Sequence, residues 1–263
     1  MKTKAVIDYI VAWLTDYCEK AGMNGFVIGI SGGVDSAVTS TLCAKTGKEL
    51  VALKMPIHQR ESQTTLADRH IDWLMGHFSA VRTNNLDLSP AYDSFRRILP
   101  EDVQDELVLA NTQSRLRMIT LYAFASHHKL LVAGTGNKVE DFGVGFFTKY
   151  GDGGVDISPI ADLMKSEVRL LAREMGIIPE IVTAVPVDGL FADNRSDEDQ
   201  IGATYEELEW AMHYETSGGI IVPEETLTPR QKEVLAIYRR FNKSNRHKME
   251  PVPMAKIPDA LKH

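Results

Sequence analysis

The chain is poor in cysteine and has no long apolar run. Its two cysteines, Cys18 and Cys43, lie in segments with helical apolar spacing, which favours small buried side chains in a reducing compartment over a disulfide framework. No apolar run approaches the length needed to cross a membrane. The N-terminal lysines are soon followed by Asp8 and Asp16, so no signal-peptide core develops. These absences favour a cytoplasmic protein with no membrane partner.

The chain also lacks an excess of positive charge. Its 29 lysines and arginines face 36 aspartates and glutamates, which gives a net charge of −7 and argues against a nucleic-acid partner. Hydrophobic residues make up 44% of the chain and charged residues 25%, as is ordinary for a globular protein that buries a core. A chain of this length is expected to form a single domain, residues 1–263.

Short apolar runs alternate with segments of helical periodicity. Strands are expected at 25–30, 50–55, 80–83 and 130–134. Helices are expected at 4–21, 34–45, 62–77 and 103–127, from Ser158-Pro159 to Gly176, and from Thr228-Pro229 onward. This alternation predicts an α/β fold, a Rossmann-like parallel sheet flanked by helices, with ligands at the carboxyl ends of the strands. The polar, glycine-containing residues 187–204 predict a mobile surface loop.

One strand-to-helix turn has the residue types of a ligand-binding loop. The apolar run 26–30 breaks into Ser31-Gly32-Gly33-Val34-Asp35-Ser36, and such a turn can present backbone N–H groups and a helix N-terminus to a phosphate. No lysine follows the glycines, and a carboxylate, Asp35, stands there instead. A carboxylate beside a phosphate cradle makes sense mainly when a divalent cation lies between them. The loop therefore indicates ATP bound as a Mg²⁺ complex, with pyrophosphate as the group held; the alternative is an ordinary glycine-rich turn.

A second cluster follows the strand expected at 130–134. Residues 134–156 hold seven glycines, four carboxylates and two lysines. Glycine lets the backbone approach a ligand closely, Lys149 can neutralise a phosphate, and Glu140 can share a metal with Asp35. A long solvated loop with a β-hairpin is the structural alternative.

These motifs resemble those of a known family. The segment 31–36 resembles the signature of the ATP-pyrophosphatase (PP-loop) superfamily, and Phe-Phe-Thr-Lys-Tyr-Gly-Asp-Gly-Gly-Val-Asp-Ile-Ser-Pro at 146–159 is similar to that of ammonia-dependent NAD synthetases. The segment 114–118 also looks like a helix of that family. The resemblance implies an adenine nucleotide alpha-hydrolase-like fold and a ligase that adenylates deamido-NAD with ATP, releases pyrophosphate, and amidates the adenylate with ammonia. It also implies Mg²⁺ and a homodimer.

The resemblance implies roles for individual residues, none of them a side-chain nucleophile. Those that would bind ATP are Gly29, Ile30, Ser31, Gly32, Gly33, Val34, Asp35, Ser36, Thr135, Lys165 and Val187. Those that would ligate Mg²⁺ are Asp35 and Glu140. Those that would bind deamido-NAD are Arg115, Lys149 and Asp156, together with His247 and Lys248, which are expected to reach substrate bound mainly by a neighbouring subunit.

The chain departs from the family pattern at three places. It is one residue longer between Glu140 and Gly145, so Asp141 competes with Glu140 as the second metal ligand. Met249 stands where an arginine is usual. Val187 replaces a threonine whose hydroxyl often contacts ATP, so no side-chain hydrogen bond can form there.

Other functions remain open at this point. Another PP-loop adenylating amidoligase or a tRNA-modifying enzyme would share the loop at 29–36, and a non-catalytic ATP-binding module would share the sheet. The tRNA-modifying alternative conflicts with the acidic charge, and the binding module has no need of paired metal carboxylates. The phosphate loop arrives so early in the chain that no glutaminase domain is expected. Free ammonia is then the predicted donor, with a separate glutaminase partner left open.

Overall fold

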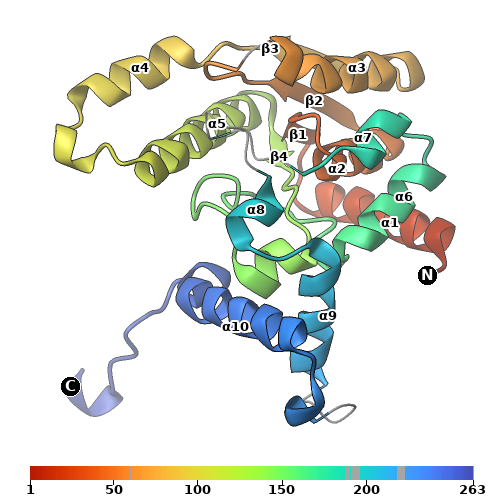
Figure 1. Ribbon diagram of the computed structural model, residues 1–263. Helices are drawn as coiled ribbons and strands as arrows, with labels where there is room; N and C mark the ends of the chain where they lie inside the picture. The colour runs from red at the N-terminus through yellow and green to blue at the C-terminus, as the bar shows by residue number, and fades with distance from the viewer. Residues whose placement is uncertain (60, 187–189, 191–195, 218–222, 263) are drawn as a thin grey trace.

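The computed structural model describes residues 1–59, 61–186, 190, 196–217 and 223–262. Its centre is a parallel sheet in the order β3-β2-β1-β4, which consists of β1 (Gly25–Gly29), β2 (Glu49–Lys54), β3 (Val81–Asn85) and β4 (Leu130–Val132) (Figure 1). In the middle of the sheet, Val27 pairs with Val51 on one side and Val132 on the other. The strands predicted from the sequence are confirmed to within about two residues.

Helices cover both faces of the sheet. The described helices are α1 (Thr3–Lys20), α2 (Val34–Lys45), α3 (Glu61–His77), α4 (Ser89–Ile98), α5 (Glu106–His128), α6 (Lys165–Glu174), α7 (Pro179–Thr183), α8 (Asp197–Ile201), α9 (Tyr205–Thr216) and α10 (Pro229–Met249). Alternate strand residues point to opposite faces. Phe26 and Ile28 therefore join the core with α1, α2 and α6, whereas Val27 joins the core with α5.

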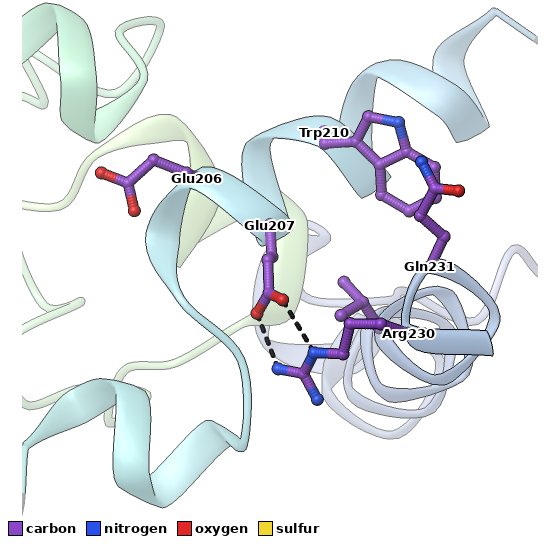
Figure 2. A pocket seen from close by; sticks show the side chains of 6 residues that line it. Glu206, Glu207, Trp210, Arg230 and Gln231 are labelled. Atoms are coloured by element: carbon purple, nitrogen blue, oxygen red, sulfur yellow. Dashed lines mark hydrogen bonds and ion pairs between the residues drawn. The ribbon is translucent and has the colours of Figure 1, made fainter. Parts of the chain in front are cut away.

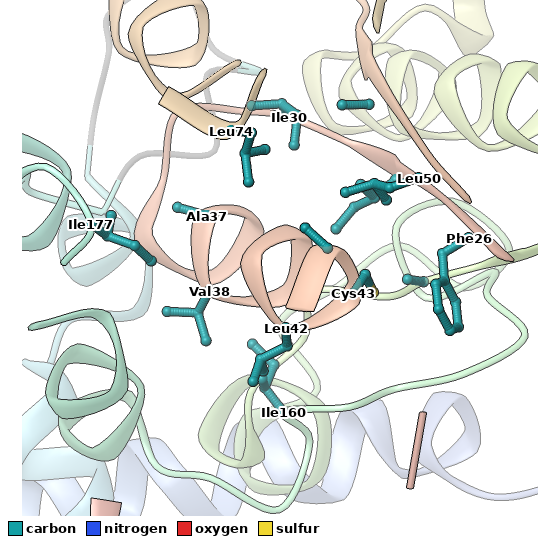
Figure 3. Close-up of a cluster of buried hydrophobic side chains, with 14 of the residues drawn as sticks. Phe26, Ile30, Ala37, Val38, Leu42, Cys43, Leu50, Leu74, Ile160 and Ile177 are labelled. Carbon is teal, nitrogen blue, oxygen red and sulfur yellow. The ribbon is translucent and has the colours of Figure 1, made fainter. Parts of the chain in front are cut away.

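Helix α2 lies inside the larger core. Figure 3 shows its Ala37, Val38 and Leu42 within a shell of side chains from the sheet, from α3 and from residues after β4, including Phe26, Leu50, Leu74, Ile160 and Ile177. The polar residues Thr39 and Ser40 of α2 are also fully buried. A helix packed on every side holds its N-terminus rigidly, and that N-terminus is the part that adjoins the phosphate loop.

A second core forms beside the sheet. Helices α9 and α10 pack on one another and on a π-helical turn, Val139–Val144, through buried side chains that include Val139, Val144, Leu208, Val234, Leu235 and Tyr238 (Figure 1). The helix predicted from Thr228-Pro229 is present as α10, and a capping box of Thr228 and Gln231 begins it. This second core positions the segment that follows β4.

Three sequence predictions need correction. The helix expected from Ser158 begins only at Lys165, because Ile157 still bridges to Ala133 and Met164 is extended, with its N–H donating to Glu167. The helix expected from 103 begins at Glu106, where the Asp105 side chain caps it. The loop expected at 187–204 contains α8, capped by Ser196; residues 187–189 and 191–195 lie outside the described part. No described helix is long and apolar enough to span a membrane.

Candidate active site

The phosphate loop is closed by its own hydroxyls. Ser31 Oγ and Ser36 Oγ lie 3.0 Å apart, the Gly33 N–H donates to Ser31 Oγ at 3.1 Å, and Ser36 Oγ donates to the Gly33 carbonyl at 3.0 Å. Gly32 has φ +89, and a Cβ there would lie 2.9 Å from the Ala67 nitrogen of α3. Only glycine fits this position, so the sequence Ser-Gly-Gly builds one fixed turn.

The loop ends at the N-terminus of α2, with Gly33 as the N-cap and no side-chain cap among the described residues. The first N–H groups of a helix have no partner within the helix, and together with the helix dipole they attract an anion. Ser31 follows β1 and Thr135 follows β4, which are neighbouring parallel strands. The two residues therefore meet at the same edge of the sheet, as predicted.

A buried ion cluster lies beside the loop. Lys165, at the start of α6, places its Nζ 2.5 Å from Asp35 Oδ2 and 3.1 Å from Glu140 Oε1. The Lys165 side chain is 3% exposed and each carboxylate side chain 15%. Burial alone would lower the pKa of Lys165, but Asp35 and Glu140 outweigh it and raise that pKa. Burial raises the pKa of Asp35, and the Lys165 ammonium opposes this increase.

The carboxylates of this cluster fit a divalent cation. Asp35 Oδ1 is buried and has no hydrogen-bond partner among the described residues, which leaves it available as a ligand. The described residues contain no group of three or more acidic, histidine or cysteine side chains arranged to hold a metal alone. Mg²⁺ is usually held by one or two carboxylates together with substrate phosphates and water. Asp35 and Glu140 beside a phosphate loop match that arrangement.

Three residues of this site were missed by the sequence analysis. The Tyr205 hydroxyl donates to Glu140 Oε1 at 2.5 Å and lies 3.2 Å from Asp197 Oδ2. Asn137 is fully buried, and its Oδ1 accepts from the backbone N–H groups of Val139 and Glu140. Burial and the nearby Glu140 and Asp197 raise the pKa of Tyr205, so its hydroxyl stays protonated. No local motif marks Tyr205 or Asp197 in the sequence.

The segment between Glu140 and Gly145, where the resemblance predicts one extra residue, lies in a π-helical turn, Val139–Val144. A π turn accommodates one inserted residue within a helix, and such turns are frequent at functional sites. The turn sends the two adjacent carboxylates in different directions. Glu140 meets Lys165, whereas Asp141 lies over Gly136, where an added Cβ would stand 2.1 Å from its Oδ1. Burial, followed by the charge of Glu140, raises the pKa of Asp141 to about 8.

Asp141 faces a cavity of about 160 Å³. The residues that line it are Gly134, Gly136, Asp141, Phe142, Phe147, Asp152, Gly153, Val155, Ser158, Lys248 and Met249. The last two come from the end of α10, so this helix closes one side of the cavity. Gly153 also requires glycine, because a Cβ there would lie 2.4 Å from the Phe147 ring. We call this space the Asp141 cavity.

Of the residues predicted to bind deamido-NAD, Lys248 lines this cavity and the others do not. Lys248 Nζ donates to the Phe147 carbonyl at 2.7 Å, and Lys149 Nζ donates to the His247 carbonyl at 2.6 Å. The Arg115 guanidinium donates to the Lys149 carbonyl at 3.4 Å. The end of α10 therefore contacts the 146–149 segment of its own chain.

Asp156 is held by the sheet. Its Oδ2 accepts from the Val132 N–H at 2.8 Å, and its Oδ1 accepts from the Tyr122 hydroxyl at 3.0 Å. Val187, predicted to adjoin ATP, lies outside the described residues. The predicted ATP-binding and metal-binding residues that the structure describes thus gather at one edge of the sheet, and Asp156 is bonded to the last residue of β4 at the same edge.

A separate hollow of about 250 Å³ lies between α9 and α10, lined by Glu206, Glu207, Trp210, Arg230, Gln231 and Val234. In Figure 2 the Arg230 guanidinium faces the Glu207 carboxylate, to which its Nε and Nη2 both donate at 2.7 Å. None of the residues predicted to bind a ligand lines this hollow. Its ion pair joins two helices and belongs to the second core.

The fold and the site together define a nucleotide-binding α/β protein with a PP-loop. A family model described as NAD synthase matches residues 6–252, and the chain belongs to this family. A curated NH(3)-dependent NAD(+) synthetase from Mannheimia succiniciproducens is 32% identical over 98% of both chains. One from Carboxydothermus hydrogenoformans is 35% identical over 93% of this chain and 95% of the relative.

A solved structure of the NMN synthetase from Francisella tularensis superposes with a TM-score of 0.84. It is 30% identical and aligns with 98% of this chain and 100% of its own.

Proposed function

We propose that this protein is an ammonia-dependent NAD synthetase. A carboxylate oxygen of deamido-NAD attacks the α-phosphorus of ATP, pyrophosphate leaves, and an acyl-adenylate remains. Ammonia then attacks the acyl carbon, a proton is lost, and AMP departs with the bonding electrons to leave the amide of NAD. The observation that carries this proposal is the meeting of Asp35, Glu140 and Lys165 beside an anion-binding helix N-terminus in a chain of the NAD synthase family.

Residues from separate segments of the chain would contact the phosphates of ATP. The backbone N–H groups at the start of α2 and the hydroxyls of Ser31 and Ser36 bind the phosphates of ATP. Lys165 supplies a positive charge to them and replaces the lysine that the loop itself lacks. Because the reaction needs no side-chain nucleophile, the enzyme acts by positioning the two substrates and stabilising charge.

Asp35 and Glu140 would hold Mg²⁺ with those phosphates. Glu140 fits this role better than Asp141, because it shares the Lys165 ammonium with Asp35 whereas Asp141 faces the cavity on the other side of the π turn. A Mg²⁺ ion held there would neutralise negative charge on the phosphates.

The Asp141 cavity is proposed as the place of the nicotinate end of the substrate. It opens next to Gly134 and Gly136 at the carboxyl end of β4, and it is lined by two phenylalanine rings and two carboxylates. A pyridinium ring is a flat cation that aromatic faces attract, and its positive charge would favour ionisation of the Asp141 carboxyl, whose pKa burial raises. Lys149, His247 and Lys248 would contact the rest of the nucleotide.

Incubation with ATP, Mg²⁺, ammonium chloride and deamido-NAD tests the activity. We expect NAD, AMP and pyrophosphate in equal amounts, and D35N to lose all three. Release of ADP and phosphate in place of AMP and pyrophosphate would refute the proposal. Glutamine in place of ammonium tests the donor: we propose that residues 1–263 form one synthetase domain that uses free ammonia, so this chain should make no NAD from glutamine.

A second candidate substrate comes from the superposition on an NMN synthetase along almost the whole chain. The same adenylation and amidation applied to nicotinate mononucleotide would give NMN. The Asp141 cavity holds a ring, not a whole dinucleotide, and so admits either acid. The ratio of kcat/KM for deamido-NAD to kcat/KM for nicotinate mononucleotide decides between the two; a ratio below one would assign NMN synthesis.

We also propose that the protein is a cytoplasmic homodimer. The side chains of Ile98, Leu107 and Ile119, on α4 and α5, are each more than half exposed although they are apolar. Exposed apolar side chains on neighbouring helices favour burial against a partner. Sedimentation of L107D beside the native chain tests this proposal, with a shift from dimer to monomer expected.

A further inference from the structure

Three separate elements meet at the Glu140 carboxylate: the π turn that carries it, the start of α6 with Lys165, and the start of α9 with Tyr205. Tyr205 is 1% exposed, and its hydroxyl donates to the same Oε1 that accepts from Lys165. The backbone of Tyr205 is fixed as well, because its N–H donates to Glu198 and the preceding Thr204 caps α9. The phenol is thus held from several directions.

The chemistry of this contact differs from that of an ion pair. A glutamate side chain rotates about three bonds, and the Lys165 ammonium alone would draw its oxygens inward. A phenol is a neutral donor, so it fixes one oxygen without cancelling the negative charge that a cation needs. The Tyr205 ring also lies 4.5 Å from Lys165 Nζ, within the range of a cation–π contact. One side chain therefore orients both charged partners.

We propose that Tyr205 is a positioning residue whose hydroxyl holds the Glu140 carboxylate in the orientation that binds Mg²⁺ with ATP. This inference rests on the proposed function, since it assigns Glu140 to the metal. Carboxylates that ligate metals are commonly hydrogen-bonded by a second residue, and loss of such a partner typically lowers metal affinity by roughly 10–100-fold. Tyr205 supplies that partner from a helix far from the phosphate loop in sequence.

The test measures metal affinity without turnover. Mn²⁺ is titrated in the presence of α,β-methylene-ATP, which cannot release pyrophosphate, and free Mn²⁺ is followed by electron paramagnetic resonance. Y205F keeps the ring and loses the hydroxyl, and we expect its Mn²⁺ Kd to rise about tenfold. The Mn²⁺ Kd of Y205L, which also loses the ring, should rise further. Y214F, in a buried position on the same helix, is the matched control and should keep native affinity.

A double-mutant cycle ties the effect to Glu140. In an E140Q background, Y205F should change the Kd by less than twofold, because the charged partner is already gone. In steady state, Y205F should raise the KM for Mg²⁺ and recover native kcat at saturating Mg²⁺. A Y205F Kd equal to native, an undiminished effect in E140Q, or a native chain that binds no Mn²⁺ with the analogue would overturn the proposal.

A second measurement avoids any folding defect of the variants. The ¹⁹F resonance of 3-fluorotyrosine placed at position 205 should shift when Mg²⁺ and the analogue are added, and this shift should be absent from E140Q. An unmoved resonance in the otherwise native chain would refute a contact with the metal carboxylate. Neither binding measurement requires deamido-NAD, so failure of this inference is distinct from failure of the proposed amidation.

Discussion

The two halves of the site are assembled in different ways. The phosphate-loop half comes from one contiguous segment, 29–36, and its hydrogen bonds close within five positions of sequence. The half around the Asp141 cavity, where we propose that the nicotinate end binds and which we call the nicotinate half, depends on contacts across about a hundred positions: Asn242 and Asn245 of α10 donate to the Gly143 and Val144 carbonyls. The first half is therefore specified locally and the second by tertiary packing.

The two halves of the site also rest on different hydrophobic cores. The half that handles ATP rests on α2, which is buried on all sides, so a change there disturbs the main core. The other half rests on the smaller core of α9 and α10, and its cavity is closed by the last residues of a helix. Substitutions at the cavity can therefore alter which nucleotide is bound while the ATP chemistry is preserved.

Removal of the Lys165 charge should produce the largest effect. K165M keeps the length of the side chain but leaves Asp35 and Glu140 buried against one another. Loss of one partner from a buried ion cluster costs about 3–5 kcal/mol of stability, and loss of a charge that faces the phosphates lowers kcat by roughly 10²–10³-fold. Urea denaturation and steady-state kinetics measure the two effects.

Added Mg²⁺ sharpens this prediction, because a cation between the two carboxylates replaces the missing charge. It should stabilise K165M more than the native chain. K138M is the matched control: Lys138 pairs with Asp162, whose side chain is 96% exposed, so its loss should cost less than about 1 kcal/mol. Equal stability of K165M and K138M would show that the buried cluster contributes nothing.

The same contrast explains what the sequence could predict. The strands and the phosphate loop were predicted because apolar runs bounded by glycine carry their signal locally. The Ser158-Pro159 signal was misleading, since these residues follow the bridge between Ile157 and Ala133 and lie in the connection that leads to α6. Tyr205 was missed because its contact with Glu140 exists only after α9 packs against the π turn.

The extra residue after Glu140 illustrates an intermediate case. The sequence showed that it was there and left two candidate metal ligands, Glu140 and Asp141. Only the π turn shows how they separate, because an α-helical turn and a π turn direct neighbouring side chains differently. Local patterns thus located the site, whereas the direction of each side chain required the packed structure.

The packing of α3 against α2, which supports the phosphate loop, should make the free energy of unfolding depend on pH. His70 of α3 is fully buried, with Nε2 2.9 Å from Ser40 Oγ of α2, and burial lowers its pKa to about 4. The unfolded chain protonates this imidazole near pH 6.5, so below that pH the unfolded state binds the extra proton. Stability should fall by about 3 kcal/mol between pH 6.5 and 4.

Urea denaturation across that pH range measures the loss. H70Q retains an amide N–H for Ser40 and removes the titration, so its stability curve should be flatter than the native one by this amount. H213Q, at an exposed position of α9, should leave the native slope unchanged. A native slope in H70Q would disprove the assignment to His70.

A methyl group at Gly136 should disturb the nicotinate half alone. In G136A the new Cβ would stand about where the Asp141 carboxylate lies, so Asp141 must rotate away from the cavity wall. We expect KM for the nicotinate nucleotide to rise about tenfold, the size of one lost polar contact, with KM for ATP near native. In a D141A background the same methyl should have little effect; an equal effect there would place the cause elsewhere.

The smallest effect is expected at Met249, the residue that stands where the family usually has arginine. It is the last residue of α10, lines the Asp141 cavity and lies close to Gly145. A guanidinium there can meet a phosphate only at a solvated rim, where an ion pair contributes about 0.2–1 kcal/mol. M249R should therefore raise kcat/KM for deamido-NAD by up to about fivefold at low salt and leave kcat unchanged. If charge alone matters, M249K should raise kcat/KM for deamido-NAD by a similar factor. An increase seen with M249R and not with M249K would indicate a bidentate contact between the guanidinium and a phosphate. A changed KM for ATP would instead show that the two halves of the site are coupled through α10.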